Sequence, residues 1–169
     1  MPDDSPALAA LLQLAYSGER AAALAYRGHA ASLADAEERR RVQEIEREEL
    51  HHRQLVGEML AALGSGPSAA RERRAVVIGT IISLSCRILP WFVPMYGAGR
   101  LERGNVGEYE TAARLARAAG RADWVDCLLT MAEVEWEHER YFREKVESHP
   151  WSRWIRPWPP LPPKAAIRA

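Results

Sequence analysis

Hydrophobic residues recur at steps of three and four along most of the chain, which is the period of an amphipathic helix. An alternating strand pattern is almost absent, and no repeat of solenoid length stands out. The pattern predicts four helical blocks, at about 6–34, 36–63, 95–119 and 122–148. Breaker residues at 64–68, Gly120 and Pro150 end the last three. We therefore expect an all-α fold.

The most apolar stretch, residues 75–99, precedes the third block and belongs with it. Arg87, Pro90 and Pro94 interrupt this stretch, whereas a membrane-spanning helix needs about 20 predominantly apolar residues. We expect a buried helix followed by a kinked connection into the third block. A segment lying on a membrane surface is the alternative.

The last residues differ in composition, so we divide the chain into a helical bundle, 1–149, and a tail, 150–169. From His149 onward there are six prolines, three tryptophans and four basic residues, but no acidic residue. This composition favours an extended chain over a helix. We expect a strap packed over the bundle or a neighbouring subunit, and a Trp/Arg anchor at a membrane interface is the alternative.

Two of the helical seams contain a Glu-x-x-His pair. One register of the second block is apolar except at Glu49 and His52, and one register of the fourth is interrupted by Glu135 and His138. The competing pair Glu48–His51 has a poorer register, and it is expected to face solvent. In the fourth block the remaining glutamates, Glu133, Glu137 and Glu139, are expected to point mostly outward, and His149 is expected at the surface.

The other two seams each contain a single glutamate. Glu19 interrupts the apolar seam of the first block, and Glu102 interrupts that of the third. Glu108 or Glu110 competes with Glu102, because two glycines weaken the third block. His29 shares a seam with Glu19 but lies almost three turns away, so a buried core histidine is expected there.

One Glu from each of two helices and one Glu-x-x-His from each of two others is typical of di-metal carboxylate four-helix bundles. Residues i and i+3 share a helix face, so a Glu and a His can reach the same metal pair. Four buried carboxylates would cost several kcal/mol each if uncompensated, and two divalent cations would cancel their charge. Arginine partners or protonation are the alternative. The predicted ligands are Glu19, Glu49, His52, Glu102, Glu135 and His138. Carboxylates with imidazoles favour two Fe ions, or Mn, over structural zinc.

Charge and cysteine content restrict the other function classes. Lys+Arg and Asp+Glu number 23 each, so a basic nucleic-acid-binding face is not expected. Cys86 and Cys127 are too few for a disulfide framework. Asp3 and Asp4 stand where a signal peptide would carry positive charge. We expect a cytoplasmic protein, and peripheral contact with a membrane surface remains open.

Four segments carry a family resemblance: "YSGERAAALAYRGHA", "EELHHRQL", "LERGNVGEYETAARLA" and "EVEWEHERYF". In their order of Glu, Glu-x-x-His, Glu and Glu-x-x-His they resemble the ferritin-like superfamily, over nearly the whole chain except the tail. The resemblance implies an antiparallel four-helix bundle with a crossover connection, a di-iron site and a homo-oligomer.

Within that superfamily the chain resembles demethoxyubiquinone hydroxylases most. The resemblance rests on the apolar segment before the third block, the short length, and Tyr109 seven residues after Glu102. It implies a di-iron oxidoreductase that uses oxygen to hydroxylate a quinone or another apolar substrate, attached peripherally to membranes. The family has a His directly before that Tyr, and here Glu108 stands in its place.

The fourth block, "MAEVEWEHERYFREK", resembles rubrerythrins instead, which implies a peroxidase. Their usual four-cysteine iron module cannot be built from two cysteines, so an external electron donor is expected. A ferroxidase or iron-storage unit of a larger shell, and a structural scaffold, are further alternatives.

These resemblances suggest roles within the site. We expect Glu49 and Glu135 to bridge or clamp the metals, His52 and His138 to be terminal ligands, and Glu19 and Glu102 to complete the set. Tyr26 and Tyr109 are candidate catalytic residues that relay electrons or donate a proton; buried structural tyrosines are the alternative. Residues 88–96 are either an apolar entrance for a quinone or core packing.

Overall fold

The structure, a computed structural model, describes residues 5–169, so Asp3 and Asp4 lie outside the described residues. Within that range all regular structure is helical, and the predicted all-α class is confirmed. The α-helices are α1 (Ser5–Ser32), α2 (Ala36–Ala62), α3 (Ala69–Ser85), α4 (Phe92–Ala118) and α5 (Val125–Ser148). The 3-10 helices are η1 (Ala122–Trp124), η2 (Pro150–Arg153) and η3 (Lys164–Arg168). The described residues divide into two compact units, 5–90 and 91–169.

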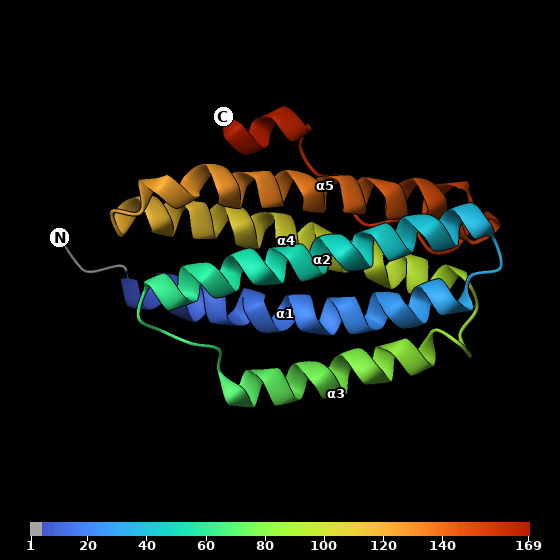
Figure 1. Ribbon diagram of the computed structural model, residues 1–169. Helices are drawn as coiled ribbons and strands as arrows, with labels where there is room; N and C mark the ends of the chain where they lie inside the picture. Colours follow the sequence, from blue (N-terminus) through green and yellow to red (C-terminus); the bar gives the residue numbers. More distant parts are fainter. Residues whose placement is uncertain (1–4) are drawn as a thin grey trace. The chain divides into compact units, whose positions relative to one another are not determined.

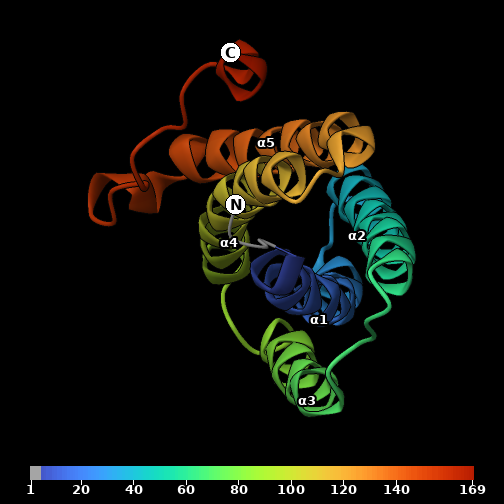
Figure 2. The same cartoon turned by 90° about the vertical axis from the view of Figure 1, so that its left-hand side faces the viewer.

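In the first unit α1 packs against both α2 and α3 (Figures 1 and 2). The short connection between α1 and α2 makes them an antiparallel pair. The side chain of Asp35 caps α2 by accepting a hydrogen bond from the backbone N–H of Glu38, at 2.8 Å. The helix ends before Gly64, whose φ of 64° suits a residue without a Cβ.

The helix α3 corrects the expectation of a buried helix in the apolar stretch. Of its residues only Ala75 and Gly79 are buried, and the aliphatic residues Val77, Ile81 and Leu84 are more than half exposed. Small residues make its contact with α1, so the larger apolar side chains of α3 face away from that helix. No helix among the described residues has a stretch long and apolar enough to cross a membrane.

In the second unit α4 and α5 lie side by side (Figures 1 and 2). The helix α4 begins at Phe92, three residues before the predicted start, because proline is tolerated at Pro94 in the first turn. Gly120, with a φ of 76°, allows the short connection to α5. Fully buried residues such as Met95 and Phe142 form the core of this pair.

The tail belongs to the same unit as α4 and α5, and it packs on them as a strap. After η2 the chain runs extended and then forms η3, which lies beside α5 (Figure 1). Trp158 and Ile167 of the tail are buried, whereas Trp154 is 87% exposed. The tail therefore has contacts of its own within this unit.

Candidate metal-binding triads

The first unit brings together three of the predicted ligands. Glu19 comes from α1, and Glu49 and His52 come from successive turns of α2. Each offers one ligand atom, and these atoms lie within 4.8 Å of one another. All three side chains are buried. The seam periodicity that predicts their inward position is therefore matched by the geometry.

The second unit brings together the other three. Glu102 comes from α4, and Glu135 and His138 come from α5. Their ligand atoms also lie within 4.8 Å of one another, and all three side chains are buried. His138 Nδ1 is 3.6 Å from Glu135 Oε2, as the i,i+3 spacing on one helix face allows.

Asn105 links the two carboxylates of this second triad. Its Nδ2 donates hydrogen bonds to Glu102 Oε2 at 2.9 Å and to Glu135 Oε2 at 3.3 Å. The sequence pattern suggests no role for Asn105. Its position three residues after Glu102 could have predicted the hydrogen bond, since that spacing puts an amide donor beside the carboxylate.

The electrostatics of the second triad favour a bound cation. Burial raises the pKa of Glu102 well above its ordinary value, and the nearby charge of Glu135 raises it further. Two carboxylates held this close in an apolar interior repel each other unless a proton or a cation compensates them. Two carboxylates and one imidazole per triad form a hard donor set that suits iron or manganese. In both units the donor chemistry therefore fits the predicted metals.

The structure also places the alternative ligand. Glu108 is only half-buried, and it is not among the described residues grouped as possible metal ligands. Glu102, by contrast, is buried beside Glu135. The geometry therefore favours Glu102, and its role as a metal ligand stays a prediction.

The two candidate catalytic tyrosines are buried on the same helices as the single glutamates. Tyr26 lies seven residues after Glu19 on α1, and Tyr109 lies seven residues after Glu102 on α4. Two helical turns therefore separate each tyrosine from its glutamate along the helix. This position fits both a relay and a purely structural role, so their catalytic role stays a prediction.

Glu139 corrects the expectation that the remaining glutamates of α5 point outward. Glu133 and Glu137 make exposed ion pairs with the tail, but Glu139 is buried. It accepts a hydrogen bond from Trp158 Nε1 and pairs with Arg143. Helical periodicity misses this contact because the covering residue comes from a segment without periodicity.

The histidines outside the triads differ in burial. His29 is a buried core residue, as expected, and burial lowers its pKa from 6.5 to about 4 despite attraction to Glu38. His51 is exposed, as expected. His149 is expected at the surface, but it is half-buried and its ring packs against Phe92 and Trp151. The aromatic residues Phe92 and Trp151 are the sequence feature that could have predicted this packing.

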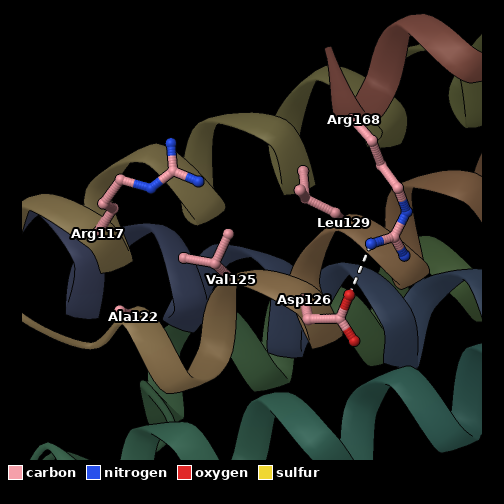
Figure 3. A pocket seen from close by; sticks show the side chains of 6 residues that line it. All are labelled: Arg117, Ala122, Val125, Asp126, Leu129 and Arg168. Atoms are coloured by element: carbon pink, nitrogen blue, oxygen red, sulfur yellow. Dashed lines mark hydrogen bonds and ion pairs between the residues drawn. The ribbon is translucent and has the colours of Figure 1, made fainter.

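A surface pocket of about 340 Å³ lies in the second unit, and none of the second triad's residues lines it (Figure 3). Its lining residues are Arg117, Ala122, Val125, Asp126, Leu129 and Arg168. Figure 3 shows Arg168 reaching Asp126, so this cation of the pocket already has an anionic partner. None of residues 88–96, the predicted apolar entrance, lines it, and the entrance stays a prediction.

Comparison with protein families gives a match that covers the helices of the first unit. Residues 6–86 match the family of the ubiquinone biosynthesis protein COQ7. The predicted resemblance to the ferritin-like demethoxyubiquinone hydroxylases is thereby confirmed over this range. The COQ7 match includes Glu19, Glu49 and His52, and it ends before the second triad. Neither curated proteins nor solved structures give a match.

The COQ7 match also bears on the competing predictions. It favours a hydroxylase role over the peroxidase and iron-storage alternatives. The rubrerythrin-like character of residues 131–145 stays a prediction, since that helix lies outside the matched range.

Proposed function

We propose that the two triads form one di-iron centre in a single antiparallel four-helix bundle, and that the protein hydroxylates a quinone or a related apolar ring with oxygen. The observation that carries the proposal is the repetition of one ligand set. Each unit contributes a Glu from one helix and a buried Glu-x-x-His from the next. That combination is the ligand set of ferritin-like di-iron proteins, and the COQ7 match supports a quinone as the class of substrate.

Four carboxylates and two imidazoles suit two ions better than one. Two divalent cations carry four positive charges, which four glutamates neutralise. In the proposal Glu49 and Glu135, which are both completely buried, would hold both ions, and Glu19 and Glu102 would complete the ligand set. When bound, the two ions supply the redox and Lewis-acid chemistry needed to activate oxygen.

The histidines and Asn105 orient this ligand set. In the proposal His52 and His138 would hold the ions through their imidazole nitrogens, as the i,i+3 spacing from Glu49 and Glu135 allows. Asn105 holds Glu102 and Glu135 by its two amide hydrogen bonds. Such outer contacts fix the direction in which carboxylate lone pairs point.

The buried tyrosines move protons in this mechanism. In the proposal the Oη of Tyr109 donates a proton towards the reacting oxygen, and Tyr26 does the same from α1. Both tyrosine side chains are almost completely buried. Reducing equivalents come from an external donor.

In the proposal the outward face of α3 gives the protein access to its apolar substrate. Val77, Ile81 and Leu84 are each more than half exposed, and exposed apolar patches of this kind mark interaction or membrane sites. We place this face on a membrane surface, where long-chain quinones dissolve. Vesicle flotation should show binding by the wild type and weaker binding by Ile81→Ser, while Leu14→Ser on α1, also an exposed leucine, should bind normally.

Metal content tests the proposed centre directly. Protein purified without chelators from iron-supplied cells should contain about two irons per chain by mass spectrometry. Glu49→Ala and Glu135→Ala should each lose both irons, because in the proposal each of these carboxylates would hold both ions. If either variant kept one iron per chain, the triads would be separate sites and the shared centre would be excluded.

Matched controls lie on the solvent face of the same helices. Glu48→Ala on α2 and Glu144→Ala on α5 remove surface carboxylates that pair with arginines, and both should keep the full metal content.

The reaction itself is tested by incubating iron-loaded protein, a reductant and a demethoxyquinone with isotope-labelled oxygen. Labelled hydroxyl in the quinone supports the proposal, whereas reductant-dependent removal of peroxide without ring hydroxylation would support the rubrerythrin-like alternative.

A further inference from the structure

The tail is fastened to α5 by hydrogen bonds that satisfy its irregular backbone. Arg143 Nη1 donates to the carbonyl of Trp158 at 2.8 Å, and Nη2 donates to the carbonyl of Pro159 at 3.0 Å. Trp136 Nε1 donates to the carbonyl of Pro162 at 2.9 Å. Proline-rich chain cannot form its own helical hydrogen bonds, so these side chains define where the tail lies.

Trp158 is the buried anchor of this segment. Its indole is 6% exposed, and its Nε1 donates a 2.6 Å hydrogen bond to Glu139 Oε1. A Cβ at Gly99 would lie 2.3 Å from the indole ring and 2.9 Å from the Cβ of Phe142. The ring therefore occupies the space that any side chain at Gly99 would need, beside the contact between α4 and α5.

Trp158 contacts Gly99 and Glu139, and Phe142 lies against Gly99; each of these positions is one turn from a predicted ligand of the second triad. Gly99 precedes Glu102 by three residues, Glu139 follows Glu135 by four, and Phe142 follows His138 by four. Residues separated by three or four are neighbours on a helix face. A single tail residue therefore touches both ligand-bearing helices beside the triad.

From these contacts we infer that Trp158 is a positioning residue for the metal centre: it fixes α4 against α5, so that Glu102, Glu135 and His138 converge. The inference rests on the proposed function, because it concerns how well the triad holds metal. It assigns the tail, which lies outside the family match, a role in metal affinity. Groups that orient metal ligands from outside typically change affinity by about 10–100-fold when replaced.

Cobalt(II) titration of the full-length, metal-free protein, followed by visible absorption, tests this role without catalysis. Trp158→Ala should bind cobalt about 10–100-fold more weakly than the wild type. Trp158→Phe keeps an aromatic ring against Gly99 but loses the N–H, and should lie between the two. Trp154→Ala is the matched control, since that tryptophan is 87% exposed, and it should bind like the wild type.

Wild-type affinity in Trp158→Ala would overturn the inference while leaving the proposed centre intact. A wild type that binds no cobalt would instead overturn the proposed function and this inference with it. Should Trp158→Ala not fold, Trp158→Phe decides, because it removes the hydrogen bond to Glu139 while keeping a ring against Gly99. Weakened cobalt binding with unchanged helicity then supports the positioning role, and wild-type affinity overturns it.

Discussion

The two helix pairs each carry two glutamates and one histidine as predicted ligands, but a different kind of segment packs against each pair and acts as its brace. A third helix, α3, packs on the pair α1–α2, while the tail packs on the pair α4–α5. At Gly28 of α1 a Cβ would lie 2.4 Å from the backbone of Ser83, and at Gly79 of α3 it would lie 2.7 Å from the carbonyl of Ala21. The first brace therefore depends on close backbone approach between small residues.

The second brace depends on side chains that satisfy the tail. Trp136 and Arg143 donate to three tail carbonyls, and Arg168 pairs with Asp126 at 2.6 Å. A helix satisfies its own backbone, so α3 can dock through small residues and leave its aliphatic side chains exposed. An irregular segment must have its polar groups satisfied from outside. The difference shows how one ligand geometry can be supported by two unrelated kinds of chain.

Core truncation should have the largest effect and tests whether the two regions unfold together. Phe142→Ala should lower the free energy of unfolding by about 3–5 kcal/mol, and Ile45→Ala by about 2–5 kcal/mol, because both side chains are completely buried. All six tryptophans lie at residue 91 or later. Tryptophan fluorescence therefore reports only the second unit, whereas far-ultraviolet circular dichroism reports all helices.

For a cooperative protein both probes should give one midpoint in urea for each variant. If Ile45→Ala shifted the circular dichroism transition and left the fluorescence transition in place, the two regions would unfold independently. Ile155→Ala, at an exposed tail residue, should change neither midpoint appreciably and serves as the control.

His29 should make the first region sensitive to acid. Its pKa is about 4 in the folded protein and 6.5 ordinarily, so the unfolded chain takes up the proton first as the pH falls. The stability that the neutral His29 contributes is fully present above about pH 6.5 and is lost between pH 6.5 and 4. At pH 5 the loss is about 2 kcal/mol. Urea unfolding at pH 7 and 5 measures it. His29→Gln should remove this part of the loss, and an unchanged pH dependence would contradict the prediction.

The close contact between α1 and α3 should be sensitive to a single methyl group. Gly28→Ala forces α3 away from α1, because a backbone obstructs the new Cβ, and should cost about 1–3 kcal/mol. Gly18→Ala on the same helix meets nothing within 4 Å and should instead stabilise the protein by up to ~1 kcal/mol. Thermal unfolding compares them, and equal effects of the two substitutions would argue against the docked position of α3.

The ion pairs of Glu72 should have a smaller effect. Burial raises the pKa of Glu72, but hydrogen bonds and attraction from Arg53 and Arg20 outweigh it, so the pKa lies below its ordinary 4.5. This residue connects α3 with α2 and α1, and Glu72→Gln should cost about 1–2 kcal/mol at pH 7. The difference should shrink as the pH falls through the lowered pKa. Arg40→Gln, which breaks an exposed pair on α2, should be nearly neutral in the same urea titration.

Local periodicity predicts much of the fold and of the candidate site. The four principal helices end within three residues of their predicted bounds, because capping residues and glycines punctuate them. The inward positions of Glu49 and His52 follow from counting along one seam. The same counting fails for Glu139, since the residue that buries it is nineteen positions away in a segment without periodicity. It also fails for α3, where apolar composition suggests burial but small residues make the contact.

The sequence alone determined which residue types share a helix face, because that depends only on the helical repeat. Counting along that repeat is therefore enough to single out the glutamate and histidine of each Glu-x-x-His pair. The tertiary structure decided which face each helix presents to its neighbour, that α3 keeps its aliphatic side chains exposed, and that the tail inserts Trp158 against Gly99. Such choices depend on shape complementarity between segments far apart in the chain, and no local pattern encodes it.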